Sequence, residues 1–331
     1  MAISGILSSQ NHYNQRASGF WPTSFYVVVA LGRRAIFGFG APSSGNSSLT
    51  NIVSDTGVVA SDTTGVGTAR YGLGAAGYGT DKAIFGYGDA AGTYVSISNL
   101  VSNTGVVATD TVGVGTVRNY VVGTTYGTDK AMFGYGFVTS PGLNTVSTIN
   151  LVSNTGVVAS DTSASGTTAS NRGAAGYGSS GQAIFGFGSN WTDWPGTPVS
   201  NISITNLVSN TGVVASNTAG VGTGRSGAKA ASYGTDKAIF GYGGNSSGEL
   251  SITSLVSNTG VVASDTTGVG SARGGVAAAS FGSSGQAIFG YGNIAGNVTG
   301  VTNLVSNTGV VANDVAGVGT ARQMPGAASF G

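Results

Sequence analysis

Residues 70–88 read RYGLGAAGYGTDKAIFGYG, and this stretch decides the fold of the chain. Arg70 is followed by small residues, a polar turn at residues 79–82, and an apolar run that ends in a glycine–aromatic–glycine triplet. Residues 71–77 and 82–87 each have the length of a β-strand, and the turn between them is typical of a hairpin. The stretch therefore predicts two antiparallel strands, the first built from small side chains.

The apolar run recurs six times along the chain. Copies of Ala-Ile-Phe-Gly-aromatic-Gly, one with Met in place of Ile, are spaced 48 to 55 residues apart and begin at Ala35, Ala83, Ala131, Ala183, Ala238 and Ala287. A second block, such as NLVSNTGVVATDT from Asn99, follows each copy and predicts two further strands, residues 94–101 and 105–109, around an Asn/Gly hairpin. No segment has a helical period, so the sequence predicts an all-β protein of six four-stranded units.

Composition excludes several kinds of chemistry. The chain has 331 residues, of which 59 are glycine and only 8% are charged, and its formal net charge is +1, so no basic surface for nucleic acid is expected. The lack of cysteine and the single histidine, His12, argue against zinc and other metal sites. We also expect no organic cofactor, and no membrane span because no apolar run approaches about 18 residues.

The order of elements in residues 70–88 resembles the kelch repeat of β-propellers. Kelch units run from an arginine through a small-residue inner strand and a hairpin to an apolar strand that ends in a glycine pair. This chain departs from that pattern in its triplet, Gly86-Tyr87-Gly88, and in having Val106-Val107 where kelch units carry tryptophan. The resemblance covers residues 25–331 and implies a six-bladed propeller of four-stranded antiparallel blades, preceded by an N-terminal arm at residues 1–24.

The resemblance is to the near-identical-repeat propellers found among bacteriophage virion proteins, and it implies a function. The expected protein is a non-enzymatic head of a tail fibre or appendage, located in the virion, that contacts a host surface such as a glycan or other virion proteins. Its N-terminal arm would serve self-assembly. A capsid or tail decoration subunit with only protein contacts and a secreted, lectin-like bacterial adhesin on the cell surface remain open alternatives. An enzyme is disfavoured, because the only acids outside the repeated positions are Asp55, Asp89, Asp193 and Glu249, and no pattern marks a glycosidase pair.

Two charged positions recur in nearly every unit. The arginines are Arg70, Arg118, Arg225, Arg273 and Arg322, with Arg172 in the most divergent linker, and the acids are Asp62, Asp110, Asp161, Asp265 and Asp314, with Asn217 in the remaining unit. Rings of charge near an axis could bind an ionic ligand. Copies in five or six units instead favour a structural ring, in which each side chain satisfies loop backbone groups or links neighbouring blades.

The segments that join the second and third strands differ between units. They are residues 41–48, 89–93, 137–146, 189–200, 244–249 and 293–297. In a propeller they emerge on one face, and insertions that differ between repeats mark a binding face. Exposed tryptophan stacks on sugars or anchors protein contacts, so we expect binding at Trp191, Asp193, Trp194 and Phe137. The alternative is that the two tryptophans pack over the blade edge.

The chain ends in a further copy of the inner strand, residues 322–330. We expect this strand to close the propeller by pairing with the second strand of the first unit, Arg34–Phe39, because an open edge is an aggregation hazard. Residues 25–31 also read as a strand and compete for the same place. Ala327 and Ala328 suit a crowded axis better than Val27–Val29, which favours the C-terminal strand.

Overall fold

The computed structural model describes residues 32–140, 142–190 and 200–331. All regular elements in these residues are strands, and none of them is a helix, so the all-β prediction is confirmed. The expected N-terminal arm, the competing segment Phe25–Leu31, and Trp191, Asp193 and Trp194 lie outside the described residues. The described part from Gly32 to Gly331 forms one compact unit.

Six antiparallel sheets repeat one pattern, and we number them 1 to 6 along the chain by their central strands. The inner strand of each sheet lies at one edge: β27 (Gly326–Phe330), β3 (Gly74–Tyr78), β6 (Val122–Tyr126), β12 (Gly173–Tyr177), β17 (Lys229–Tyr233) and β22 (Ala277–Phe281). The central strands are β1 (Arg34–Gly38), β4 (Lys82–Ala90), β7 (Lys130–Gly134), β13 (Gln182–Gly186), β18 (Lys237–Gly241) and β23 (Gln286–Gly290). The third strands are β2 (Thr50–Val53), β5 (Thr93–Val101), β10 (Thr148–Val152), β16 (Thr205–Val208), β21 (Thr253–Val256) and β26 (Thr302–Val305).

Four of the segments between central and third strands form small ladders of their own. These pair β8 (Phe137–Val138) with β9 (Asn144–Thr145), β14 (Ser189–Asn190) with β15 (Ser200–Asn201), β19 (Gly244–Asn245) with β20 (Gly248–Glu249), and β24 (Asn293–Ile294) with β25 (Asn297–Val298). In sheet 2 the equivalent residues continue β4 and β5 beyond an irregularity between Gly86 and Gly88.

The expected fourth strand is reduced to isolated bridges in most sheets. In sheet 2, Val107 bridges Val101 and Thr111 bridges Ser98, but residues 105–109 form no strand. Among the residues that the structure describes, a regular fourth strand occurs only in sheet 3, where β11 (Thr162–Ser163) pairs with β10. The prediction of four full strands was wrong because the segment after the hairpin lacks alternating apolar residues and is rich in glycine, which gives an edge strand little to pack.

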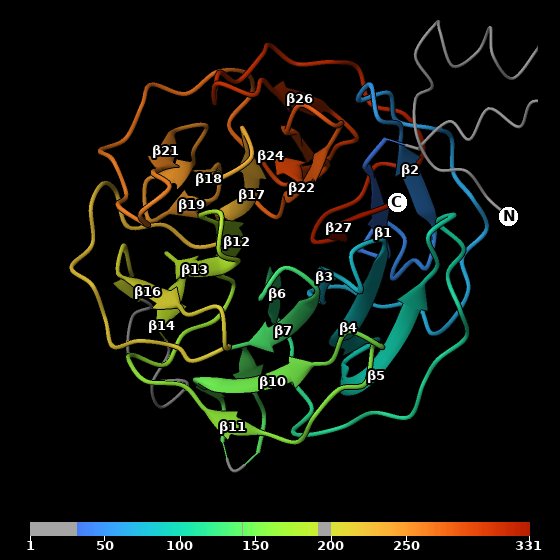
Figure 1. Ribbon diagram of the computed structural model, residues 1–331. Helices are drawn as coiled ribbons and strands as arrows, with labels where there is room; N and C mark the ends of the chain where they lie inside the picture. Colours follow the sequence, from blue (N-terminus) through green and yellow to red (C-terminus); the bar gives the residue numbers. More distant parts are fainter. Residues whose placement is uncertain (1–31, 141, 191–199) are drawn as a thin grey trace, which may run out of the picture. The chain divides into compact units, whose positions relative to one another are not determined.

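The inner strands of successive sheets lie side by side. Strand β3 contacts β6, and the succession continues through β12, β17, β22 and β27, which in turn contacts β3. In Figure 1 the six sheets accordingly follow one another about a common centre. Alanine and glycine on these strands permit the close approach: Ala76 and Ala328, for example, are only 4% exposed.

The central strands supply the core between sheets. Phe240 of β18 is fully buried, and its ring lies 5.1 Å from that of Phe187 in sheet 4. A Cβ atom on Gly173 or Gly186 would lie within 3 Å of the Phe240 ring, so glycine is needed there. Equivalent phenylalanines, all fully buried, are Phe37, Phe85, Phe133, Phe185 and Phe289, at the inter-sheet position that the sequence predicts.

The C-terminal strand pairs with the first strand of the described chain. Strand β27 runs antiparallel to β1, with Arg34 opposite Phe330 and Gly38 opposite Gly326, which is the expected pairing. The Gly331 N–H also donates to the Asp81 carbonyl of sheet 2 (2.9 Å). Residues from both ends of the described chain therefore complete sheet 1.

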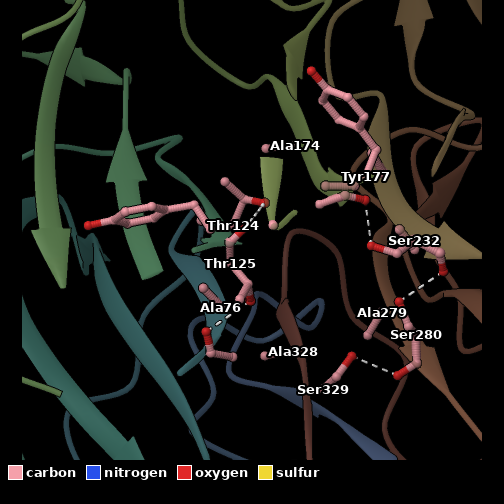
Figure 2. A pocket seen from close by; sticks show the side chains of 18 of the residues that line it. Ala76, Thr124, Thr125, Ala174, Tyr177, Ser232, Ala279, Ser280, Ala328 and Ser329 are labelled. Atoms are coloured by element: carbon pink, nitrogen blue, oxygen red, sulfur yellow. Dashed lines mark hydrogen bonds between the residues drawn. The ribbon is translucent and has the colours of Figure 1, made fainter. Parts of the chain in front are cut away.

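Two series of hydrogen bonds join neighbouring inner hairpins. At the turns, six backbone N–H groups donate to carbonyls of the next sheet at 2.7–2.9 Å: Gly79 to Asp129, Gly127 to Gly181, Gly178 to Asp236, Gly234 to Gly285, Gly282 to Arg33 and Gly331 to Asp81. Nearer the strand centres, four hydroxyls donate to neighbouring carbonyls: Thr125 to Gly77, Ser232 to Gly176, Ser280 to Ser232 and Ser329 to Ser280 (Figure 2). The two remaining equivalent positions are Gly77 and Gly176, which have no hydroxyl to donate.

Gly176→Ser should therefore stabilise the protein. A Cβ atom at Gly176 meets nothing closer than 3.6 Å, and the Thr125 carbonyl lies at that distance, so the new hydroxyl can complete the missing bond. We expect a gain of about 0.5–1.5 kcal/mol in the free energy of unfolding, from the hydrogen bond and from restricting the unfolded chain. Chemical denaturation measures it. Gly77→Ser is the comparison: its Cβ would lie 3.0 Å from the Ser329 carbonyl, so it should gain less. A loss of stability in Gly176→Ser would contradict the prediction.

Candidate functional site

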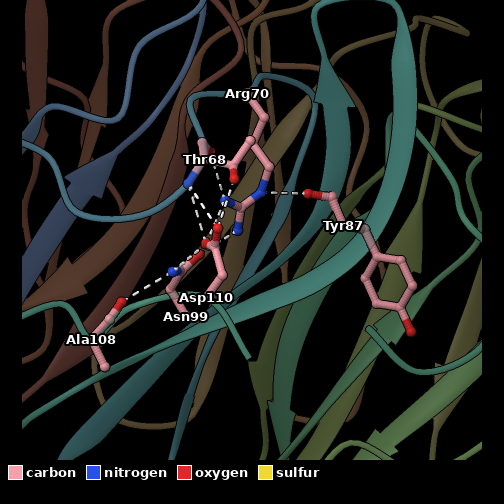
Figure 3. Close-up of polar contacts among 6 residues, drawn as sticks. All are labelled: Thr68, Arg70, Tyr87, Asn99, Ala108 and Asp110. Carbon is pink, nitrogen blue, oxygen red and sulfur yellow. Dashed lines mark hydrogen bonds and ion pairs between the residues drawn. The ribbon is translucent and has the colours of Figure 1, made fainter. Parts of the chain in front are cut away.

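Each repeated arginine is buried between two neighbouring sheets. The guanidinium of Arg70 lies 4.2 Å from the ring centroid of Phe39, in the preceding sheet. Its Nη2 donates to Asn99 Oδ1 (2.7 Å) and its Nε to the Tyr87 carbonyl (2.8 Å), both in sheet 2, and Asp110 Oδ1 is 3.9 Å from Nη1 (Figure 3). Arg118, Arg172, Arg225, Arg273 and Arg322 are equally buried and stack on Tyr87, Tyr135, Phe187, Tyr242 and Tyr291. The arginines thus join sheets and present no charge to an open surface.

Arg322 forms this link between the two ends of the repeat array. It stacks on Tyr291 of sheet 6 (4.1 Å), and its Nη2 donates to Asn51 Oδ1 of sheet 1 (2.6 Å). Thr320 donates through its backbone N–H and its hydroxyl to Asp62 of sheet 1 (2.8 and 2.7 Å). Sheet 6 and sheet 1 are therefore joined by the same contacts as sheets 1 and 2, where Arg70 and Thr68 take these roles.

The Arg172 side chain lies between two neighbouring sheets as the other arginines do, but its backbone position in the repeat is different. The carbonyl that accepts from Gly136 belongs to Ala169, whereas the equivalent acceptor for Gly88 is Arg118 itself. Arg172 comes three residues later, yet it stacks 4.2 Å from the Tyr135 ring and donates to Asn206 Oδ1 (2.9 Å). The divergent linker therefore keeps the interaction although it changes the spacing.

The repeated aspartates accept hydrogen bonds that hold the loop before each arginine in place. Asp110 accepts from the Asn99 amide (2.8 Å), the Thr68 N–H (3.0 Å) and the Thr68 hydroxyl (2.6 Å). Burial opposes ionisation of Asp110, but these hydrogen bonds and the charge of Arg70 outweigh it and lower its pKa. The pKa values of Asp62, Asp161, Asp265 and Asp314 are lowered for the same reasons. Asn217 accepts from Thr167 and Asn206 in the equivalent place.

Asp110→Asn should cost more stability at pH 7 than at pH 3. A carboxyl whose pKa is lowered on folding stabilises the protein above its unfolded pKa of about 4, and this contribution disappears as the pH falls through the lower folded value. Because Asp110 is partly exposed and Asn217 shows that an amide keeps the bonds, we expect a loss of only about 0.5–1 kcal/mol at pH 7. Urea denaturation at both pH values measures it. An equal loss at both would refute the charge-based account, and Asn217→Asp is the reciprocal control.

Side chains that differ between repeats gather where two segments meet. One is the segment that follows each arginine position, and the other joins the second and third strands of a sheet. The residue after each arginine position bridges the first residue of a variable segment, as in Tyr71–Asp89, Asn119–Phe137, Ser170–Ser189, Ser226–Gly244, Gly274–Asn293 and Gln323–Ala41. The following residue has φ between 52° and 69° in all six repeats: Gly72, Tyr120, Asn171, Gly227, Gly275 and Met324. Side chains with a Cβ are strained in this conformation, by roughly 1–2 kcal/mol, so tyrosine and methionine there point to a use other than folding.

The three non-glycine side chains of this set line one hollow. Tyr120, Asn171 and Met324 surround a space of about 390 Å³, together with Phe137, Leu143, Ser170, Ser189 and Ser226. We call this space the variable-face pocket. The Asn171 amide donates to Ser226 Oγ (3.2 Å) on its polar side. A pocket with apolar and aromatic walls and a few orienting polar groups has the character of a ligand site.

Tyr71 extends the aromatic surface beside this pocket. Its ring meets that of Tyr120 edge-on, with 6.3 Å between centroids, and its hydroxyl donates to Asp89 Oδ2 (3.2 Å). Burial, the neighbouring Tyr120 and the charge of Asp89 raise the pKa of Tyr71, so it remains a neutral phenol.

The inner strands enclose a second space, about 330 Å³ in volume, which we call the axial cavity (Figure 2). Alanines, glycines and hydroxyl-bearing residues such as Thr124 and Ser280 line it. A void of about 40 Å³ shares six of these residues and adds Lys229. This void therefore adjoins the axial cavity, and Lys229 lies in its wall.

The sequence analysis identified one of the residues of the variable-face pocket, Phe137. It missed Tyr120, Asn171, Ser226 and Met324, because they lie far apart along the chain. A signal was present for two of them: the second residue after the arginine is glycine after Arg70, Arg225 and Arg273, but it is Tyr120 after Arg118 and Met324 after Arg322. Asn171 precedes Arg172, so only the structure assigns it to the same position. That difference marks a strained position that accepts a side chain in only half of the repeats.

Comparisons with family models and with curated proteins find no match. No protein-family model matches the chain, and no curated protein is significantly similar to it. Within the residues that the structure describes, no three His, Cys, Asp or Glu side chains are grouped as metal ligands. Nor does that part of the chain contain a helix long and apolar enough to cross a membrane.

Proposed function

We propose that the six sheets form a six-bladed, kelch-like β-propeller that acts as a non-enzymatic recognition head. The cyclic succession of inner strands and the repeated arginine links between all neighbouring sheets support the fold. The proposed function rests on one observation. The repeats carry the same types of residue where neighbouring sheets face each other, and different residues around the variable-face pocket. A scaffold with no binding task has no need for strained tyrosine and methionine at positions where glycine is free of strain.

We place this head in a phage virion, on a tail fibre or appendage that contacts a host surface or other virion proteins. This assignment rests on the kelch-like resemblance and on the near-identical repeats. The mixture of aromatic rings with amide and hydroxyl groups favours a sugar-bearing surface, because aromatic faces stack on sugars and the polar groups fix their orientation. A decoration subunit would use the same face for protein contacts alone, and a secreted adhesin would use it on a cell surface.

The test removes the strained side chains. Tyr120→Gly and Met324→Gly each install the residue that three other repeats carry, so melting temperature should stay equal or rise. Binding on an array of bacterial surface glycans should fall at least tenfold. Val213→Ser, on an exposed hairpin, is the control that should change neither property. Unchanged binding in both glycine variants would place recognition elsewhere, and Trp191→Ala with Trp194→Ala would then test the other predicted residues.

A further inference from the structure

Two cations, and no acidic side chain of the described residues, line the axial cavity and the void that adjoins it. Arg33 lines the cavity together with the hairpin residues Thr128, Ser179 and Thr235, and Lys229 lines the adjoining void. All other lining side chains there are neutral. Most of the acids of the chain are occupied in loops, as with Asp110 beside Arg70 and Asp236 beside Lys237. The charged side chains that line these two spaces are therefore all positive, although the net charge of the chain is only +1.

Lys229 is exceptional among the equivalent residues of the six inner strands. The other five sheets have Gly74, Val122, Gly173, Ala277 and Gly326 at this position. The Lys229 ammonium donates to the Asn171 amide oxygen (3.2 Å) and to the Arg172 carbonyl (3.3 Å), and no carboxylate of the described residues lies within 4 Å of it. Burial without a counter-ion lowers the pKa of Lys229 to about 8, so at pH 7 it remains mainly protonated.

We propose that the axial cavity binds a small hydroxylated carboxylic acid, of the acidic-sugar class, with its carboxylate at Lys229. An ammonium group has three N–H donors, and neutral acceptors occupy two of them, which leaves one for an anion. The walls beside it are alanine, glycine, valine, leucine and proline, and in such surroundings an ion pair is much stronger than in water.

The dimensions of the two spaces agree with this ligand class. The 40 Å³ void accommodates a head group only, whereas the 330 Å³ cavity leaves room for a body of several carbon atoms. Thr124, Thr125 and Ser280 line the larger space, and their hydroxyl protons are donated to backbone carbonyls. Their oxygens can still accept hydrogen bonds, which suits a hydroxylated body better than an apolar one. This site meets the variable-face pocket at Asn171, which lines that pocket and accepts a hydrogen bond from Lys229. Its test reads alanines of the two axial spaces, so its failure and the failure of the proposed function are distinguishable.

The experiment compares D-glucuronate with D-glucose, which has CH₂OH in place of the carboxylate. The probes are the ¹³C-labelled alanine methyl groups of the full chain, because Ala174, Ala230 and Ala278 line both spaces. We expect glucuronate to shift these three signals saturably and glucose to leave them unchanged. Lys229→Ala, which copies Ala277, should weaken the response at least tenfold, whereas Lys237→Gln on the same hairpin should bind as the wild type does.

Three results would overturn the proposal. They are a wild-type protein that does not respond to glucuronate, an equal response to glucose, and a Lys229→Ala variant that binds glucuronate as the wild type does. Methyl signals of alanines outside the cavity, such as Ala35 and Ala183, report in the same spectra whether the variant has kept its fold.

Discussion

Deleting residues 321–331 should leave no stably folded monomer. The deletion removes β27 from sheet 1, the buried side chains of Ala328 and Phe330, and the Arg322 link between sheets 6 and 1. It also exposes the free edge of β1, which is a template for intermolecular pairing. These losses together are comparable to the whole stability of a typical domain, about 5–15 kcal/mol. Size-exclusion chromatography and thermal melting should therefore show aggregated or unfolded protein.

A synthetic peptide of residues 321–331 provides the control for this deletion. If the loss is due to the missing strand and not to general damage, adding the peptide in excess should restore a cooperative melt. Deleting Gly331 alone, which removes one hydrogen bond to Asp81, should lower stability only slightly. A truncated monomer that melts as the full chain does would show that β27 is dispensable for the fold.

Phe240→Ala should lower the free energy of unfolding by about 3–5 kcal/mol, the usual cost of emptying a fully buried aromatic site. The ring lies between sheets 4 and 5, against Phe187 and over Gly173 and Gly186, so its loss opens a cavity that the backbone cannot fill. Guanidinium denaturation measures the change.

Two further variants separate the cavity effect from side effects. Phe240→Leu keeps most of the volume and should cost less than Phe240→Ala. Val213→Ala, at a side chain that is 66% exposed, should change stability by less than about 0.5 kcal/mol. A loss below 1 kcal/mol in Phe240→Ala would mean that the neighbouring sheets can collapse onto the vacated space.

The strands that were predicted well are those specified by local chemistry. The apolar run at residues 83–86 and the turn before it appear as β4 and its hairpin, because alternation and turn residues act over a few positions. The segment at residues 105–109 was also predicted as a strand, but it forms a single bridge, between Val107 and Val101. Whether an edge segment pairs regularly depends on what it packs against, and that is not a local property.

The repeated charges illustrate a second limit. Their recurrence favoured a structural role without showing what each one contacts. Arg70 stacks on a ring 31 positions earlier and binds an amide 29 positions later, and Arg172 does the same from a shifted backbone position. Only the juxtaposition of neighbouring sheets brings these partners together.

The sequence by itself determined the all-β class, the six repeats, the core phenylalanines and the C-terminal strand as partner of Arg34–Gly38. Each follows from periodicity, side-chain size or self-similarity along the chain. The tertiary structure alone decided which side chains share the variable-face pocket and that Lys229 lines a void with no acidic side chain of the described residues in its wall. Tyr120, Asn171 and Met324 meet because the inner strands approach one another through alanine and glycine. Equivalent residues of three repeats thereby reach one place, although Met324 lies 153 positions after Asn171 in the sequence.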